Sequence, residues 1–246
     1  MAAPNLVRAA LDSQGHVAVP WCGDGRSALG RGVASSDSPA PRAIAAPRAI
    51  DNGGRRRIVL TGGPGGGKTT AADLFRREIG GRVIVVPEAA TMLFSGGFPR
   101  LKDDASRRAA QRAIFNVQRD LEHVHAVAYP GRVLLCDRGT IDGAAYWPGD
   151  PHEFFEEVRT TLEDELARYD AVLFFESAAV GGERIEGGNP ARTESNAEAA
   201  ALDARLRTLW SQHAAFTLVP HHRSFLEKVT RGMHLLQRLV DGEPAV

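Results

Sequence analysis

Short apolar runs alternate with stretches of helical periodicity from residue 55 to the end of the chain. A run of four or five apolar residues is typical of a buried parallel strand, and apolar positions three or four apart indicate one buried face of a helix. Five strands that alternate with helices favour an α/β fold with a doubly wound parallel sheet, whose ligand should lie at the carboxyl ends of the strands. The runs predict these strands at residues 57–61, 82–87, 132–136, 171–175 and 216–219.

Three segments with a helical period lie between the first four strands. The first covers residues 70–79 and should end at Gly80-Gly81, because glycine commonly terminates helices. The second covers residues 105–129, and its apolar stripe is Ile114, Val117, Leu121 and Val124. The third begins at Asp150-Pro151, with aspartate as the cap and proline in the first turn. Its apolar stripe is Phe154, Phe155, Val158, Leu162 and Leu166.

Two further helices begin at Ser-x-x-Glu capping boxes. Ser195 and Glu198 form the first box, before a helix whose apolar stripe is Leu202, Leu206, Leu209 and Trp210. Ser224 and Glu227 form the second box, before a last helix with an inward face of Phe225, Val229, Leu236 and Leu239. Residues 178–194, between the fourth strand and the first box, are polar and glycine-rich and are interpreted as a mobile loop.

The first 54 residues differ in composition from the rest of the chain. They are rich in Ala, Pro, Gly, Ser and Arg and show no sustained period. Such a segment buries too little apolar surface to offset its ordering entropy, so we expect a disordered tail (1–54) before one domain (55–246). Two alternatives stay open. The first is a transit peptide, which the excess of arginine favours and four aspartates oppose. The second is a translation start assigned too early, which would give a segment of the same composition.

The composition of the chain limits the classes of binding partner and the cellular compartment that we expect for the protein. The chain carries 30 basic and 30 acidic residues, so no strong electrostatic attraction to nucleic acid or to a membrane surface is expected. Cys22 and Cys136 form no disulfide framework and favour a reduced, cytoplasmic setting. No apolar run approaches the length of a membrane span. Nucleic acid is therefore not an expected partner, and no membrane span is expected.

The most specific chemical signal lies directly after the first strand. Residues 62–69 match the phosphate-loop pattern G-x-x-x-x-G-K-[ST]. Glycines let backbone N–H groups surround a phosphate chain, Lys68 places a charge on the β- and γ-phosphates, and Thr69 offers a hydroxyl to Mg²⁺. Glycine is common in this chain, but Lys68 is one of only three lysines, which argues against a chance match. The predicted nucleotide-binding residues are Gly62, Gly63, Pro64, Gly65, Gly66, Gly67, Lys68, Thr69 and Thr70.

Charged side chains follow the other predicted strands. Asp137 follows the third strand and is interpreted as the second Mg²⁺ ligand beside Thr69, with a helix-capping carboxylate as the alternative. Arg138 could stabilise the transferring phosphoryl group or an acceptor phosphate, or could be a surface arginine paired with Asp142. Glu88 follows the second strand, which we expect to run beside the strand before the phosphate loop. It could act as a general base on an acceptor hydroxyl, hydrogen-bond that hydroxyl, or be a first-turn helix acid.

Other candidates are less specific. Arg184 and Arg192 lie in the predicted mobile loop, where an arginine can close over the γ-phosphate, and Arg192 completes the candidate catalytic set with Lys68, Glu88 and Arg138. Gln111 and Gln118 share a helix face off the apolar stripe and could bind a base or sugar, or be solvated. Glu176 follows the fourth strand. The histidines are scattered and indicate no zinc-type site.

Several segments together carry a family resemblance. They are residues 62–70, Pro87-Glu88-Ala89-Ala90, Gly96-Gly97-Phe98-Pro99, the helix with Gln111 and Gln118, Asp137-Arg138-Gly139 with Asp142 and Tyr146, and Asn189-Pro190 with Arg192 and Glu194. From residue 57 to about 240 the chain resembles the AAA-type ATPase domain shared by the nicotinamide-riboside kinase part of NadR and the TRPL-translocation-defect proteins. The resemblance implies a three-layer, kinase-like P-loop NTPase fold and binding of ATP or GTP, without fixing the reaction.

The sequence therefore predicts a P-loop protein that binds ATP with Mg²⁺, with GTP as a possible substitute. The favoured reaction is phosphoryl transfer to an unidentified small-molecule acceptor that is nucleoside- or nucleotide-like. A second interpretation is a nucleotide-dependent switch or hydrolase that controls a protein or lipid partner. A third is a nucleotide-binding module without catalysis. Turnover of ATP with and without a panel of nucleosides would separate the three.

Overall fold

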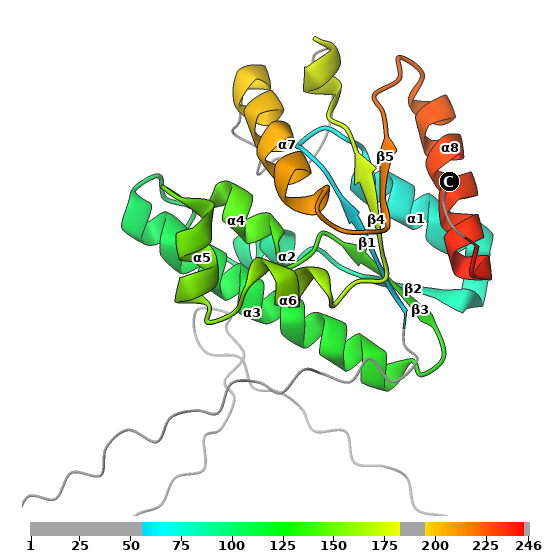
Figure 1. Cartoon of the computed structure of the whole chain (residues 1–246), viewed down its shortest axis with the longest axis horizontal. Helices are drawn as coiled ribbons and strands as arrows, with labels where there is room; N and C mark the ends of the chain where they lie inside the picture. The colour runs from blue at the N-terminus through cyan, green and yellow to red at the C-terminus, as the bar shows by residue number, and fades with distance from the viewer. Residues whose placement is uncertain (1–55, 183–194, 244–246) are drawn as a thin grey trace, which may run out of the picture. The chain divides into compact units, whose positions relative to one another are not determined.

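The computed structural model describes residues 56–182 and 195–243 of the chain (Figure 1). Five strands form one all-parallel sheet in the order β2-β3-β1-β4-β5, which confirms the predicted sheet. Because β3 separates β2 from β1, our expectation that the strand before Glu88 runs beside the strand before the phosphate loop is wrong. The strands are β1 (Arg57–Thr61), β2 (Val83–Val86), β3 (Val133–Asp137), β4 (Ala171–Phe175) and β5 (Phe216–Val219).

Helices cover both faces of this sheet and complete a three-layer arrangement (Figure 1). On one face lie α1 (Lys68–Ile79) and α8 (Phe225–Asp241). The other face is covered by α3 (Asp104–Ala128), α4 (Asp142–Tyr146), α5 (Pro151–Glu157), α6 (Leu162–Leu166) and α7 (Asn196–Trp210). The short helix α2 (Ala89–Ser95) follows β2 and packs on α3.

The sheet separates two hydrophobic cores, and alternate residues of β1 face opposite cores as the pleat of a strand requires. Ile58 and Leu60 belong to the core that includes Phe75 of α1 and Val229 of α8. Val59 belongs to the other core, where aromatic side chains from α3, α5 and α7 gather. Strands of a parallel sheet that is covered on both faces are mostly apolar, which is why the apolar runs located the strands.

Some details of the predicted helices are wrong. Phe225 of α8, which we expected to face inward, is 46% exposed. The helix expected from residue 151 to Leu166 is two helices, because the chain leaves the helical path at Arg159, whose φ is 58°, and Thr161 then caps α6 by accepting a hydrogen bond from the Asp164 N–H. In α3 the expected apolar stripe is wrong at Val124, which is 59% exposed. The buried side of this helix instead includes Gln118 and Glu122.

Smaller elements complete the described chain. The 3₁₀ helix η1 (Gly80–Arg82) joins α1 to β2, and η2 (Ala178–Gly181) begins the segment that the sequence assigns to a loop. The expected tail and the loop arginines Arg184 and Arg192 lie outside the described residues. Within residues 56–182 and 195–243, no helix combines the length and apolar character that crossing a bilayer requires.

Candidate functional site

A cleft of about 1780 Å³ lies at the carboxyl ends of the strands. Its walls come from the phosphate loop, the segment after β3, helix α2, the first half of α3 and the segment after β5. A single drug-sized ligand typically occupies about 300–1,000 Å³. The cleft therefore has room for a nucleotide and a second small molecule side by side.

The phosphate loop joins β1 to α1 and needs glycine at its first position. Gly62 has a φ of 128°, and a Cβ atom there would lie 2.1 Å from the Phe175 carbonyl oxygen. At the other end, Gly67 adopts a left-handed conformation and directly precedes the first turn of α1. The loop thus delivers the chain into the N-terminus of a 12-residue helix, whose free N–H groups and dipole favour an anion.

Lys68 is buried at the start of α1, and its ammonium group donates a hydrogen bond to the Gly63 carbonyl at 2.8 Å. Burial and the nearby charge of Arg138 lower the pKa of Lys68 to about 7, against the opposing attraction of three carboxylates, Asp137, Glu88 and Asp142. A phosphate placed in the loop would favour the charged form of this lysine. The structure thus places the Lys68 ammonium group at the phosphate loop, and its contact with a phosphate stays a prediction.

Thr69 and Asp137 meet as the sequence predicts. Pairing of β1 with β3 sets Leu60 opposite Asp137, and the Thr69 hydroxyl donates to Asp137 Oδ2 at 2.9 Å. Burial, followed by the charge of Glu88, raises the pKa of Asp137. Two adjacent oxygen donors suit Mg²⁺, which typically takes one or two protein ligands and completes its shell with phosphate oxygens and water.

Across residues 56–182 and 195–243, no three or more His, Cys, Asp or Glu side chains gather in a way that could hold a metal ion. An ion at Thr69 and Asp137 would thus depend on phosphate oxygens for most of its coordination. The metal role of the two residues stays a prediction.

Arg138 lies in the cleft rather than on the surface, with 13% of its side chain exposed. Its φ of 76° turns the chain sharply at the end of β3. The guanidinium donates to Glu88 Oε1 at 2.7 Å, to Asp142 Oδ2 at 2.8 Å and to the Gly62 carbonyl at 3.2 Å. The pairing with Asp142 is therefore present, but it is part of a four-residue connection between the phosphate loop and α2.

Glu88 precedes the first residue of α2 without capping the helix through its side chain. Besides Arg138, it accepts a hydrogen bond from the Thr91 hydroxyl at 2.5 Å. Burial raises the pKa of Glu88, but the charge of Arg138 and the bond from Thr91 outweigh it, so the net pKa is lowered. A general base works best with a pKa near the operating pH. The geometry thus favours Glu88 as a hydrogen-bond acceptor over Glu88 as a proton acceptor.

Asp142 joins three elements below Arg138. Its carboxylate accepts hydrogen bonds from the Thr61 hydroxyl at 2.8 Å and from the Trp210 indole N–H at 2.7 Å, in addition to the bond from Arg138. The end of β1, the start of α4 and the end of α7 are therefore tied together at one buried carboxylate. Tyr146, in the last turn of α4, presents its ring to the Arg138 guanidinium at 5.9 Å.

The two glutamines have different surroundings. Gln118 is buried, and its amide donates to the Arg138 carbonyl at 3.3 Å and accepts from the Ala89 N–H at 3.3 Å. It supports the backbone beneath the cleft, so the solvated interpretation is wrong for this residue. Gln111 lines the cleft two turns earlier in α3. Glu176 accepts from Arg207 at 3.3 Å and from the His221 N–H at 2.8 Å.

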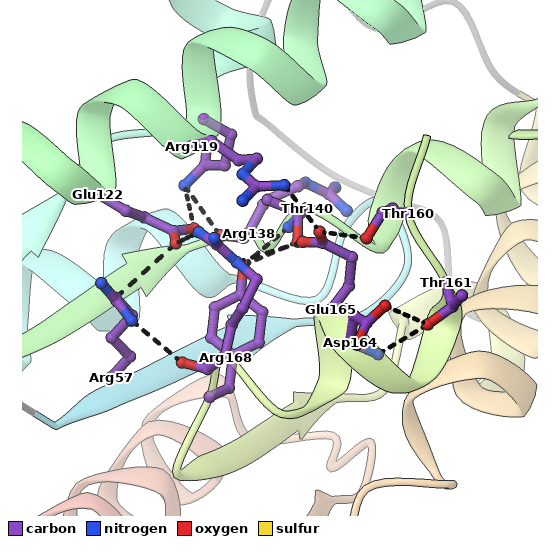
Figure 2. Close-up of polar contacts among 12 residues, drawn as sticks. Arg57, Arg119, Glu122, Arg138, Thr140, Thr160, Thr161, Asp164, Glu165 and Arg168 are labelled. Carbon is purple, nitrogen blue, oxygen red and sulfur yellow. Dashed lines mark hydrogen bonds and ion pairs between the residues drawn. The ribbon is translucent and has the colours of Figure 1, made fainter. Parts of the chain in front are cut away.

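A buried group of charged residues supports the segment after Asp137 (Figure 2). The Thr140 hydroxyl donates to Glu165 at 2.7 Å, and Arg119 pairs with the same glutamate at 3.1 Å. Tyr169 accepts from the Thr140 N–H at 2.9 Å and donates to Glu122 at 2.8 Å. These bonds fix Thr140, which lies two residues after Arg138. They therefore help to hold Arg138 in its positive-φ backbone conformation. Arg57 and Arg168 complete the group by pairing with Glu122.

Sequence patterns did not reveal this group, nor three residues that bind the phosphate loop: Ser177 after β4, Asp203 of α7 and Lys228 of α8. Periodicity gave one usable signal, because Asp203 and Lys228 each lie next to a position of the apolar stripe of their helix. Polar residues bordering an apolar stripe are candidates for buried polar contacts. The partner in each case comes from a distant segment, which sequence spacing does not show.

Comparisons with known proteins identify a family and a fold. A model of the AAA domain family matches residues 57–224. Similar solved structures include NadR protein in complex with NAD and AMP-PNP, with a TM-score of 0.53 and 17% identity over 76% of this chain and 50% of that chain. Another is NadR protein in complex with NR, with a TM-score of 0.55 and 17% identity over 76% of this chain and 52% of that chain. No curated protein matches the chain.

The chain spans about half the length of these NadR structures. At 17% identity their likeness shows the fold alone. Together with the five-stranded parallel sheet, it identifies a kinase-like P-loop NTPase fold, as the sequence resemblance implied. The family match and the fold confirm that resemblance.

Proposed function

Because the chain belongs to the AAA domain family, we propose that it is a Mg²⁺-dependent phosphotransferase that uses ATP, or GTP, to phosphorylate a small nucleoside- or nucleotide-like acceptor. The observation that carries the proposal is the joining of Glu88 and Arg138 beside the phosphate loop, in a cleft with room for a second ligand. A hydrolase needs only a water molecule there, whereas a kinase needs an acceptor site next to the γ-phosphate.

On the nucleotide side, the loop amides and the N-terminus of α1 would bind the phosphates, and Lys68 would place its charge on the β- and γ-oxygens. Thr69 and Asp137 would hold Mg²⁺, which when bound neutralises charge on the same oxygens. The half-exposed ring of Phe225, which we predicted to face inward, instead borders the cleft beside Gly67. A base could stack there.

On the acceptor side, Glu88 would accept a hydrogen bond from the acceptor hydroxyl and so orient its oxygen toward the γ-phosphorus. The new P–O bond forms as the bond to ADP breaks, and the hydroxyl proton leaves to solvent. Phosphoryl transfer is driven mainly by positioning and charge stabilisation, so a carboxylate of lowered pKa is adequate. Arg138 would stabilise the moving phosphoryl group. Arg192, outside the described residues, is proposed to add a second positive charge.

The test is the variant Glu88→Gln in an assay of phosphoryl transfer to a panel of nucleosides and nucleotides, read by mass spectrometry. Nicotinamide riboside belongs in the panel, since NadR protein of similar fold binds NR. We expect Mg·ATP affinity within about threefold of wild type and transfer reduced by roughly 10- to 100-fold, because the amide is a weaker hydrogen-bond acceptor than the carboxylate. Glu78→Gln, on the exposed face of α1, is the matched control and should behave as wild type.

One result would favour the switch or hydrolase. If the wild type phosphorylates no member of the panel and Glu88→Gln loses only ATP hydrolysis, the phosphotransferase proposal fails. If the wild type binds no nucleotide by titration, nucleotide binding itself fails, and with it all three interpretations of the phosphate loop.

A further inference from the structure

We propose that Lys228 is a positioning residue of the nucleotide site, which acts with Ser177 and Asp203 to hold the phosphate loop in its binding conformation before nucleotide arrives. We call these three residues the loop clamp. Ser177 lies two residues after β4, Asp203 lies in α7 and Lys228 lies in α8, and each bonds a different residue of the loop. The inference rests on the proposed binding of nucleotide by this loop and adds residues that the phosphate-loop motif does not contain.

Lys228 reaches the loop from the first turn of α8. Its ammonium group donates to the Gly66 carbonyl at 3.0 Å and to the Glu176 carbonyl at 2.5 Å, and it lies 5.7 Å from the centre of the Phe175 ring. Only 4% of the residue is exposed. The lysine therefore bridges the phosphate loop and the end of β4 in a place where water does not substitute easily for its hydrogen bonds.

The other two clamp residues bind the loop closer to its start. Asp203 accepts from the Gly63 N–H at 2.7 Å and from the Ser177 N–H at 2.9 Å through the same oxygen. The Ser177 hydroxyl donates to the Pro64 carbonyl at 2.5 Å. Both residues are buried. The clamp is thus one connected unit, since Asp203 fixes the backbone of the serine that in turn fixes Pro64.

The direction of these bonds matters for anion binding. A phosphate loop must present N–H groups to the anion, and a carbonyl directed at the phosphate would repel it. Ser177 and Lys228 each donate to a loop carbonyl, so the carbonyls of Pro64 and Gly66 already have hydrogen-bond partners within the protein. Because the loop is already fixed, nucleotide binding avoids part of the entropy cost of ordering it.

The clamp works through geometry rather than through added charge. Lys228 contributes one positive charge and Asp203 one negative charge, and the two attract each other. Loss of Lys228 should therefore weaken nucleotide binding by loosening the loop, while the chemical step at a saturated site is little changed.

The experiment compares wild type with Lys228→Met, which keeps an unbranched side chain but has no donor. We expect the Kd for Mg·ATP, measured by calorimetry, to rise on the order of 10- to 100-fold. Maximal ATP turnover at saturating Mg·ATP should stay within about threefold. Hydrogen–deuterium exchange of residues 62–67 without nucleotide should be faster than in wild type. Arg231→Met removes an exposed cation from the same helix and is the matched control.

Two further variants test whether hydrogen-bond donors to the loop carbonyls are responsible for the effect. Lys228→Arg restores a donor and should recover part of the affinity. Ser177→Ala removes a single hydroxyl, so it tests the clamp even if Lys228→Met does not fold, and it should raise both the Kd and the loop exchange. Unchanged affinity and unchanged loop exchange in Lys228→Met or Ser177→Ala would overturn the inference. Failure of wild type to bind nucleotide would instead overturn the proposed function.

Discussion

The buried ammonium group of Lys228 makes the stability of the folded chain depend on pH in a defined direction. Burial lowers the pKa of Lys228 to about 8 from the ordinary value of 10.5, although the carboxylates of Asp203 and Glu176 oppose the shift. Between these two values the unfolded chain binds more protons than the folded chain. The contribution of this lysine to the free energy of unfolding therefore rises with pH between pH 8 and pH 10.5. Below pH 8 the full free-energy cost of holding a buried charged ammonium group is present.

The size of the effect follows from the shift. A difference of one pKa unit corresponds to about 1.4 kcal/mol, so charging Lys228 in the folded protein costs about 3 kcal/mol more than charging it in the unfolded chain. In Lys228→Met this proton is absent. We predict that wild type gains about 2 kcal/mol of unfolding free energy relative to Lys228→Met from pH 8 to about pH 9.5.

Urea unfolding followed by circular dichroism, without nucleotide and with a chelator, measures this difference at several pH values. Other titrating groups are common to both proteins and cancel in the comparison, while Arg231→Met should give a difference that is flat with pH. If the difference between wild type and Lys228→Met is equally flat, the ammonium group is not desolvated at the phosphate loop. The reasoning about its hydrogen bonds to Gly66 and Glu176 would then be refuted.

Two further predictions concern the loop itself. Lys68→Ala should abolish tight Mg·ATP binding or turnover while keeping the fold. Loss of one such electrostatic contact typically lowers the rate by a factor on the order of 10²–10³. Unchanged Mg·ATP affinity by calorimetry and normal turnover would contradict the phosphate-loop assignment. Gly62→Ala should destabilise the fold by more than about 2 kcal/mol, since its Cβ atom would strike the Phe175 carbonyl at a φ that alanine rarely adopts. A melting temperature equal to that of wild type would show that β1 and β4 can separate at this point.

Sequence patterns predicted those parts of the site whose residues are neighbours along the chain. The strand before the loop and the loop itself are contiguous in sequence, so an apolar run followed by a glycine-rich motif was sufficient to find them. Asp137 and Arg138 were found because they follow an apolar strand directly. The meeting of Thr69 with Asp137 then required only that β1 and β3 be parallel neighbours, as they are.

The other parts of the site depend on the order of strands in the sheet and on contacts between residues far apart in the sequence. Glu88 reaches the site although β2 is not next to β1, because Arg138 extends from β3 to meet it. Apolar spacing put Val124 on the stripe of α3, yet the buried ion pairs draw Glu122 inward instead. Polar residues are buried in such places when a distant partner satisfies them, and a single sequence does not show the partner.

The hydrogen bond between Trp210 and Asp142 has an optical consequence. The structure describes two tryptophans, both buried, and one of them, Trp210, donates a hydrogen bond to Asp142, which in turn binds Arg138. Indole emission depends on the charges around the ring, so any ligand that draws Arg138 away from Asp142 changes the environment of this fluorophore. The domain therefore carries a built-in fluorescent reporter of its own cleft, which needs no attached dye once Trp147 and Trp21 are replaced by phenylalanine.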